Sequence, residues 1–183
     1  MEEGKKLLDP SLDEVVFRQD YSSKPQIEDV CFIDASRFVD DSGEFVEVCR
    51  LDESGSMLNI PEFRAKQINY SLVLPGAIKA WHLHRKQHDV WFVPPSSRLL
   101  AGLVDCRKDS SSNNEIKMRF ILGAGKAQLL FIPKGVAHGL ANPYNSPQNI
   151  FYLVNAYFSA EDTDELRLPW DYFGKSFWKL QYG

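Results

Sequence analysis

The sequence has no long apolar run, and this absence excludes one class of protein. No stretch of about 18 or more consecutive apolar residues occurs in the 183 residues, so no transmembrane helix is expected. The first residues, MEEGKKLLDPSLDEVV, are charged and lack the apolar segment of a secretory signal peptide. We therefore predict a protein of the cytoplasm with no membrane partner.

Cysteine and excess positive charge are also scarce. The three cysteines, Cys31, Cys49 and Cys106, form no CxxC pair, which is typical of reduced thiols in a reducing compartment. Twenty-one Lys and Arg residues against 25 Asp and Glu residues give a net charge of −4, which argues against a nucleic-acid-binding surface. The length and the 44% hydrophobic content fit one ordinary globular domain.

Sustained helical periodicity is missing as well, and short strand-like runs take its place. The runs are rich in β-branched and aromatic residues and are separated by turn-forming segments such as DDSG, PPSS and NPYNSPQ. This pattern predicts an all-β protein, and a double-sheet jelly roll of the cupin type (a double-stranded β-helix) fits it best. The expected strands lie within residues 30–39, 43–51, 67–74, 77–84, 89–93, 98–106, 116–122, 127–133 and 149–158.

The remaining segments divide the chain into an arm and one domain. Residues 1–26 are of mixed charge and are expected to form an N-terminal arm with one short helix. Residues 27–183 would form the single domain, with a loop at 53–64 and short helical turns near the C-terminus. The acidic run at 161–165 is expected to be a solvated face or the start of a helix.

Histidine and aspartate residues concentrate in two short blocks. His82 and His84 are two residues apart on an expected strand, so their side chains point to the same face. Asp89 follows five residues later, and His138 comes just after the turn that begins at Pro133. Imidazole and carboxylate groups suit one divalent transition metal, so His82, His84, Asp89 and His138 are candidate ligands. The alternative is a polar pocket that binds no metal.

Two tryptophans flank the first of these blocks. Trp81 precedes His82 directly, and Trp91 follows Asp89 by two residues. Both are expected at the pocket, either as parts of its wall or as platforms on which a sugar stacks.

A wider set of segments resembles one family in order and in spacing. The set resembles the dTDP-4-dehydrorhamnose 3,5-epimerases, which are metal-free cupins that act on nucleotide-linked 4-keto-6-deoxy sugars. The resemblance covers about residues 37–160. The segments that carry it are SGEFVEV (42–48), QINYS (67–71), GAIKAWH (76–82), LVDCRKDSS (103–111), IPKGVAHGL (132–140) and FYLVNAYFS (151–159).

The resemblance implies a proton-transfer reaction. The protons on the carbons beside a keto group are acidic, and inverting such a carbon needs a base on one face and an acid on the other. By position, His82 matches the family's base and Tyr152 its acid. The resemblance also implies a nucleotide-sugar substrate, no cofactor and a homodimer. The implied substrate-binding residues are Glu47, Gln67, Asn69, Lys79, His138 and Tyr157.

Three positions depart from the family pattern. The pocket lysine of the family, which would stabilise an enolate, falls at Asp89 or Val90. The arginine of the early segment is Ser42, and the aspartate that orients the base lies in a tail that this chain lacks. Asp89 is a candidate substitute for that aspartate. These departures keep two alternatives open, a metal-dependent cupin isomerase or dioxygenase and a silent homologue that binds sugar nucleotides.

Overall fold

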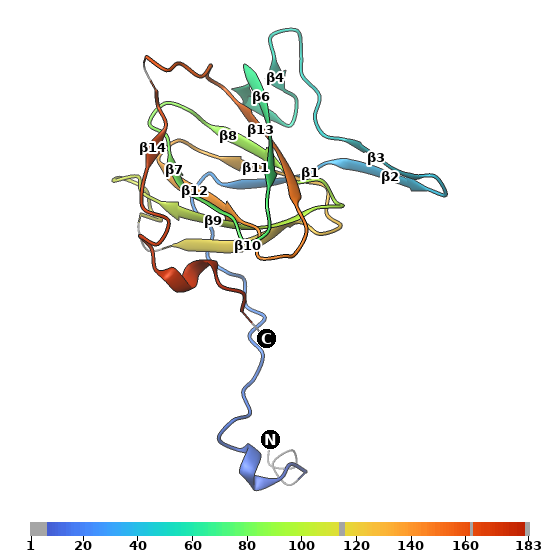
Figure 1. The fold of residues 1–183 in the computed structure, drawn as a ribbon, viewed down its shortest axis with the longest axis vertical. Helices are drawn as coiled ribbons and strands as arrows, with labels where there is room; N and C mark the ends of the chain where they lie inside the picture. Colours follow the sequence, from blue (N-terminus) through green and yellow to red (C-terminus); the bar gives the residue numbers. More distant parts are fainter. Residues whose placement is uncertain (1–6, 114–115, 162, 182–183) are drawn as a thin grey trace.

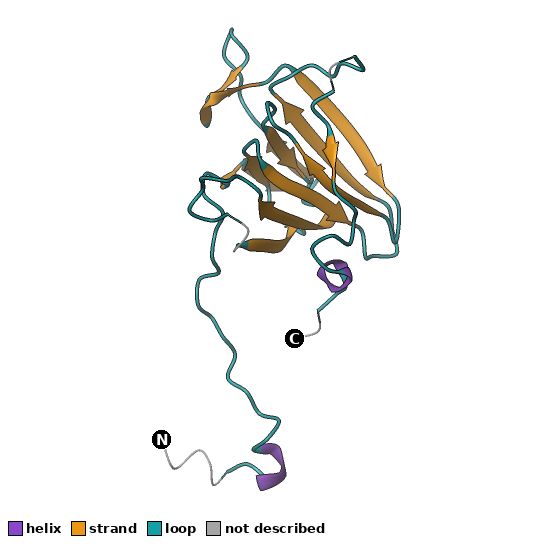
Figure 2. Ribbon diagram, turned by 90° about the vertical axis from the view of Figure 1, so that its left-hand side faces the viewer, coloured by secondary structure: helices purple, strands orange, loops and turns teal. Residues whose placement is uncertain are grey.

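Two five-stranded antiparallel sheets pack face to face and form a jelly roll, which confirms the predicted all-β cupin fold (Figures 1 and 2). The computed structural model describes residues 7–113, 116–161 and 163–181. The first sheet has the order β1 (Cys31–Asp34), β11 (Gln128–Ile132), β8 (Asp89–Phe92), β13 (Gln148–Val154) and β6 (Gln67–Val73). The second sheet has the order β10 (Lys117–Gly123), β9 (Arg98–Asp105), β12 (Val136–Ala141), β7 (Ile78–Leu83) and β14 (Leu166–Arg167).

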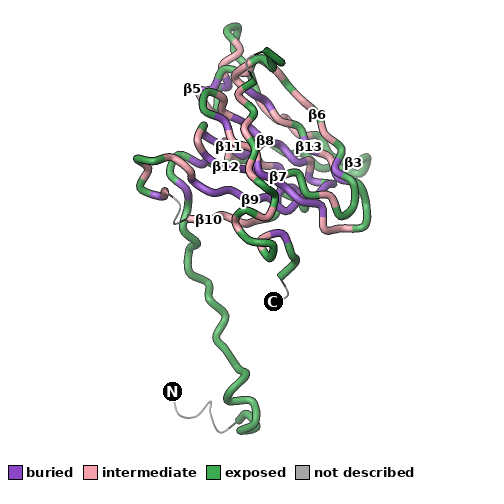
Figure 3. Tube along the Cα trace, turned by 60° about the vertical axis from the view of Figure 1, so that its left-hand side comes forward, coloured by how far each residue is buried: buried purple, intermediate pink, exposed green. Residues whose placement is uncertain are grey.

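Successive residues of β8, β9 and β12 are buried (purple in Figure 3), so both faces of these central strands are covered. The core between the sheets takes Leu130 and Ile132 from the first sheet and Leu99 and Leu103 from the second. A second cluster covers the outer face of the first sheet, and a third covers the outer face of the second. Strands that are apolar on both faces appear in sequence as continuous hydrophobic runs, which explains why RLLAGLVDC (98–106) does not alternate between apolar and polar residues.

Two small hairpins lie outside the sandwich. The first joins β2 (Ser36–Asp40) to β3 (Gly43–Glu47) and projects from the body in Figure 1. The second joins β4 (Ser56–Met57) to β5 (Ile60–Arg64), so the prediction of a loop at 53–64 is wrong in part. Met57 and Phe63 are buried there against the outer face of the first sheet. That tertiary contact gives the segment its strands despite its Gly, Ser and Pro content.

The N-terminal arm extends away from the sandwich (Figure 2). Its short 3-10 helix η2 (Pro10–Leu12) is capped by the Asp9 carboxylate, which accepts from the Ser11 backbone N–H. The arm stays exposed until Ile27, which is buried. In the parts of the chain that the structure describes, no helix has the length and apolarity needed to cross a membrane.

The C-terminal segment packs on the outer face of the second sheet. Its 3-10 helix η3 (Lys175–Trp178) brings the Phe177 ring so close to Gly102 that a Cβ there would lie only 2.4 Å from it. Trp81 is fully buried under this segment and donates its indole N–H to the Trp170 carbonyl. The expectation that Trp81 lies at the pocket is therefore wrong, because its side chain faces the opposite side of β7 from His82.

Candidate active site

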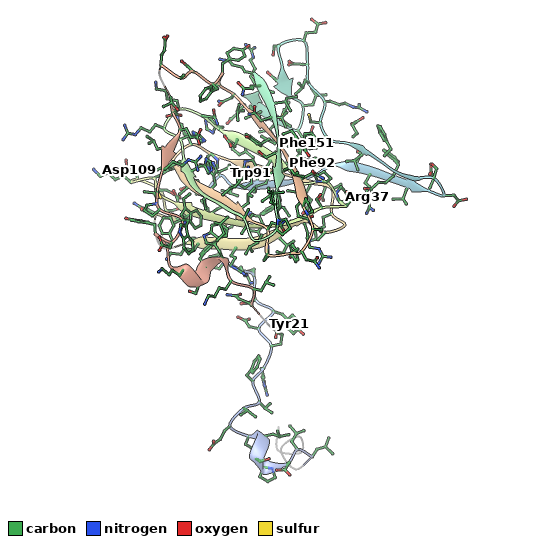
Figure 4. All side chains as sticks on the ribbon, in the orientation of Figure 1. Tyr21, Arg37, Trp91, Phe92, Asp109 and Phe151 are labelled. Carbon is green, nitrogen blue, oxygen red and sulfur yellow. The ribbon has the colours of Figure 1, made fainter. Side chains whose placement is uncertain are left out.

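A cavity of about 750 Å³ lies between the two sheets. Its walls come from the inward faces of β6, β8 and β13 on one side and of β7 and β12 on the other, with residues of the segments 156–159 and 163–167 beside them. Trp91, labelled in Figure 4, lies in the middle of the sandwich and contributes to the wall, as expected. Of the implied catalytic and substrate-binding residues, the cavity gathers His82, Tyr152, Gln67, Asn69, Lys79, His138 and Tyr157.

A bulge in the pairing of β7 with β12 sets one wall of the cavity. His138 lies opposite His82, whereas Leu140 lies opposite Lys79, so three steps on β7 match two steps on β12. Regular alternation would send residues three apart to opposite faces, and the bulge instead lets both Lys79 and His82 line the cavity. The cavity therefore has an ammonium group and an imidazole on one strand.

His82 faces a carboxylate that the sequence had not identified. Its Nδ1 lies 3.2 Å from Glu165 Oε1, and a carboxylate beside Nδ1 favours the proton there and leaves Nε2 free as a base. Burial of the ring, with the nearby charges of His138 and Arg167, lowers the pKa of His82 to about 4. The imidazole is therefore neutral near pH 7, as proton abstraction requires.

The described residues of the acidic run, 161 and 163–165, do not start a helix and are only partly a solvated face, so that prediction is wrong in part. Asp164 accepts three backbone N–H bonds at 2.8–3.0 Å. Burial acts to raise the pKa of Asp164, but these bonds outweigh it and lower the pKa. The carbonyl of Asp164 also accepts from His84 Nδ1 at 2.8 Å. The segment is thus fixed to the turn after β7. The three donors belong to Arg85, Lys86 and Gln87.

The four candidate metal ligands separate into two groups. His84, Asp89 and His138 converge, with one ligand atom from each within 4.8 Å of the others. His82 lies outside this group, although its ring stacks on His138 with centroids 5.9 Å apart. The hypothesis that Asp89 orients the base is therefore wrong: Asp89 faces His84 and His138, and Glu165 faces His82.

Tyr152 lies on β13, in the sheet opposite β7, and its side chain lines the cavity. Gln67 and Asn69 on β6 line the same wall, and Gln67 Nε2 donates to Asn69 Oδ1 at 2.7 Å. The Gln67 amide oxygen accepts from the Phe158 backbone N–H, so this residue also holds the loop after β13. Tyr157 on that loop is 72% exposed, at the mouth of the cavity.

Glu47 is the implied substrate-binding residue that does not line the cavity of its own chain. It ends β3 on the projecting hairpin, and its carboxylate pairs with the Arg50 guanidinium at 2.9 Å. No described residue of the cavity wall belongs to this hairpin.

The cavity of this β-sandwich thus holds an imidazole–carboxylate pair on one wall and a phenol on the other, which can act as a base and an acid on the two faces of a bound molecule. The family model for dTDP-4-dehydrorhamnose 3,5-epimerase matches residues 24–172, and the chain belongs to this family. All of the segments that carry the resemblance lie within this range.

Relatives support the same family. The chain is 39% identical over 132 residues to the spore coat polysaccharide biosynthesis protein SpsL of Bacillus subtilis, a match that covers 72% of this chain and 82% of the relative. It is 32% identical to the probable low-salt glycan biosynthesis epimerase Agl13 of Haloferax volcanii, over 80% of this chain and 90% of the relative. The dTDP-4-dehydrorhamnose 3,5-epimerase of Bacillus anthracis has the same fold (TM-score 0.68, 24% identity, covering 86% of this chain and 91% of that chain).

Proposed function

We propose that this protein epimerises a nucleotide-linked 4-keto-6-deoxy sugar at a carbon next to the keto group. The observation that carries the proposal is the placement of His82 and Tyr152 on facing sheets, with one cavity between them. A sugar ring in that cavity meets a base on one face and a hydroxyl donor on the other, which is the arrangement that inversion needs. The names of SpsL and Agl13 support a product destined for a surface glycan.

The base is His82 Nε2. It removes the proton from the carbon beside the carbonyl, and the electron pair moves toward the keto oxygen to give an enolate. Glu165 at Nδ1 stabilises the imidazolium that forms, in the way a carboxylate partner fixes the tautomer of a catalytic histidine. Tyr152 then delivers its phenolic proton to the opposite face of the carbon, and solvent exchange restores both groups.

The nucleotide part of the substrate requires positive charge. Three cationic side chains line the cavity, namely Lys79, Lys86 and Arg167. A lysine at position 79 provides a point charge for a diphosphate, without the forked hydrogen bonding of an arginine. Arg167 is already paired with Glu165 at 2.6 Å, so its charge acts first on this carboxylate, which is the partner of His82.

The test is deuterium uptake from D2O into a dTDP-4-keto-6-deoxy sugar, followed by NMR. Wild type is expected to exchange the proton beside the keto group and to form the epimer. His82→Asn and Tyr152→Phe should each reduce epimer formation by about 10²–10⁴-fold, the usual contribution of a general acid or base. Since Tyr152 acts after deprotonation, Tyr152→Phe should retain more exchange than epimerisation.

Matched control variants separate chemistry from folding. His88→Asn removes a histidine that stacks on Phe131 outside the cavity, and Tyr21→Phe removes an exposed phenol on the N-terminal arm. Both controls should keep wild-type turnover. Binding of the sugar nucleotide with no exchange in wild type would instead establish the silent homologue.

We also propose that the protein is a homodimer. Apolar side chains are exposed on the outward face of the edge strand β6, where they continue onto Phe151 of β13 (Figure 4). More apolar groups are exposed on the β2–β3 hairpin. A contiguous apolar face on an edge strand is a surface that proteins cover. The exposed residues are Ile68, Tyr70 and Leu72 on β6 and Phe38, Val39 and Phe45 on the hairpin.

In a dimer, Glu47 of one copy could contact a substrate bound in the cavity of the other copy. This carboxylate is on the projecting hairpin and away from its own cavity, so contact with a sugar nucleotide requires the cavity of another copy. Light scattering should give twice the monomer mass, and Ile68→Glu should produce a monomer. A wild-type monomer at high concentration would contradict the dimer, while leaving the proton transfer at His82 untouched.

A further inference from the structure

The cluster of His84, Asp89 and His138 has no part in the proton transfer described above. All three residues are buried, with exposures of 8%, 4% and 4%. Asp89 Oδ1 lies 4.0 Å from His84 Nε2, and Asp89 Oδ2 lies 3.7 Å from His138 Nε2. These separations are too long for hydrogen bonds.

The hydrogen bonds on the far side of each ring fix the tautomer. His84 Nδ1 donates to the Asp164 carbonyl at 2.8 Å, and His138 Nδ1 donates to the Val136 carbonyl at 3.0 Å. A carbonyl oxygen is only an acceptor, so each Nδ1 must carry the proton. In the neutral rings, both Nε2 atoms then direct lone pairs toward the Asp89 carboxylate.

Three electron-pair donors that face one another in a buried site repel one another unless a positive group lies between them. The Gln87 amide provides part of what is needed, because its Nε2 donates to Asp89 Oδ1 at 2.8 Å and lies 3.3 Å from His84 Nε2. Trp91 Nε1 donates to Asp89 Oδ2 at 3.2 Å. Both donors are neutral, so neither balances the charge of a buried carboxylate.

We propose that His84, Asp89 and His138 bind one divalent first-row transition ion. Two ligands on one ion with bonds of about 2.1 Å are at most about 4.2 Å apart. The two separations from Asp89, 3.7 and 4.0 Å, fall within this limit, and all three ligand atoms lie within 4.8 Å of one another, so a side-chain shift of about 0.6 Å at most is needed to complete the set. The donation of each Nδ1 to a carbonyl is the usual outer contact of a metal-binding histidine. Two imidazoles and a carboxylate suit Zn²⁺, Fe²⁺, Mn²⁺ or Co²⁺. Gln87 is only half-buried, so its amide can turn aside.

His82 is not a ligand in this proposal, because its Nδ1 faces Glu165 and its ring stacks beside His138. The ion would therefore lie in the same cavity as His82 and leave the His82 imidazole free to act as the base. The role of the ion rests on the proposed function: Asp89 falls where the family pattern has a lysine, and a bound cation would supply the positive charge that an enolate oxygen requires. Binding of the ion is a separate property and can be tested alone.

The experiment measures binding of Zn²⁺ and Co²⁺ to the full chain after treatment with a chelator, with no sugar present. Calorimetry should give one Zn²⁺ per chain, and Co²⁺ should give visible absorption bands of a nitrogen–oxygen site. Asp89→Asn and His84→Gln should weaken binding by at least about 100-fold, since changes in outer contacts alone cost about 10–100-fold. Circular dichroism and thermal melting show whether each variant is folded.

Two histidine variants act as controls. His88→Asn alters the residue next to Asp89 and should keep wild-type affinity. His82→Asn should also keep it, and loss of the ion in this variant would overturn the three-ligand set in favour of one that includes His82. Absence of stoichiometric Zn²⁺ and Co²⁺ binding in wild type, or equal binding in Asp89→Asn, would overturn the site. Neither result would alter the deuterium-exchange test of the epimerase.

Discussion

Two buried carboxylates, Asp105 and Asp89, are held in very different ways. Asp105 is fully buried, and the Arg107 guanidinium donates to both of its oxygens at 2.9 Å. Ser110 and Ser112 add hydroxyl hydrogen bonds at 2.6 and 2.5 Å. Asp89 is also buried, but its titratable neighbours among the described residues are two histidines at 3.7 and 4.0 Å.

The difference separates a carboxylate that stabilises the fold from one that is available for a ligand. Burial acts to raise the pKa of Asp105, but its hydrogen bonds with Arg107 and the serines lower the pKa well below the ordinary range. The same network reaches Glu28 and Asp29, so it fastens the first residues after the N-terminal arm to the sandwich. Asp89 has no comparable set of guanidinium and hydroxyl donors, and it borders the cavity.

The largest expected change in stability comes from Asp105→Ala. This variant leaves the Arg107 charge without its buried partner, which typically costs about 3–5 kcal/mol in the free energy of unfolding. Urea denaturation at neutral pH measures the loss. Because the folded pKa of Asp105 is depressed, its contribution is present above the ordinary value of 3.8 and declines as the pH falls below it. The gap between wild type and variant should therefore narrow in acid, and a constant gap would contradict this account.

Metal ions should stabilise the protein through Asp89. A ligand that binds only the folded state at 100 times its Kd adds about 2.7 kcal/mol to the free energy of unfolding. Zn²⁺ should therefore raise the melting temperature of wild type and leave that of Asp89→Asn unchanged. An equal rise in both proteins would mean that the ion binds elsewhere.

Asp89→Asn without added metal should change the free energy of unfolding by less than about 1 kcal/mol, in contrast to the change at Asp105. Residues kept for function are often neutral or costly for stability, since their interactions are not optimised for the fold. With Zn²⁺ present, turnover of this variant should nevertheless fall by at least about tenfold relative to wild type, because the bound cation that stabilises the enolate charge is lost. Paired denaturation and NMR assays check both parts, and a loss of stability like that of Asp105→Ala would remove the contrast.

The smallest expected change in stability comes from Glu165→Gln. The side chain is partly exposed, so the free energy of unfolding should stay within about 0.5 kcal/mol of wild type. The amide no longer stabilises the His82 imidazolium, and epimer formation should fall by about 10–100-fold. Glu161→Gln, at an exposed position of the same segment, is the matched control and should keep full activity.

Most of the fold could be predicted because the strands follow simple patterns. The expected runs at 67–74, 98–106 and 149–158 became β6, β9 and β13, with two ends unchanged and the others shifted by one to four residues. The β4–β5 hairpin could not be predicted, since burial against the outer face of the sheet outweighs its composition. The expectation for Trp81 is wrong because adjacent strand residues face opposite ways, so proximity in sequence to His82 does not place the Trp81 side chain in the cavity.

The candidate site was predictable where residues belong to regular strands. His82 was predicted from its spacing of two residues from His84 on an expected strand, whereas Tyr152 and Asn69 were implied by the family resemblance, and all three line the cavity. Glu165 was missed because the irregular segment before β14 has no periodicity from which a side-chain direction follows. The signal that could have directed attention to it was the need of His82 for a carboxylate partner, together with the acidic run at 161–165.

The packing of Trp81 has a consequence for any attempt to change the catalytic rate. Trp81 and His82 are neighbours on β7, and the C-terminal segment supports the indole from outside with Phe177 and Trp178. These aromatic contacts fix the position of β7, the strand that carries the base His82. Substitutions in η3 should therefore shift the His82 imidazole and change the catalytic rate, although η3 contacts neither the substrate nor the cavity.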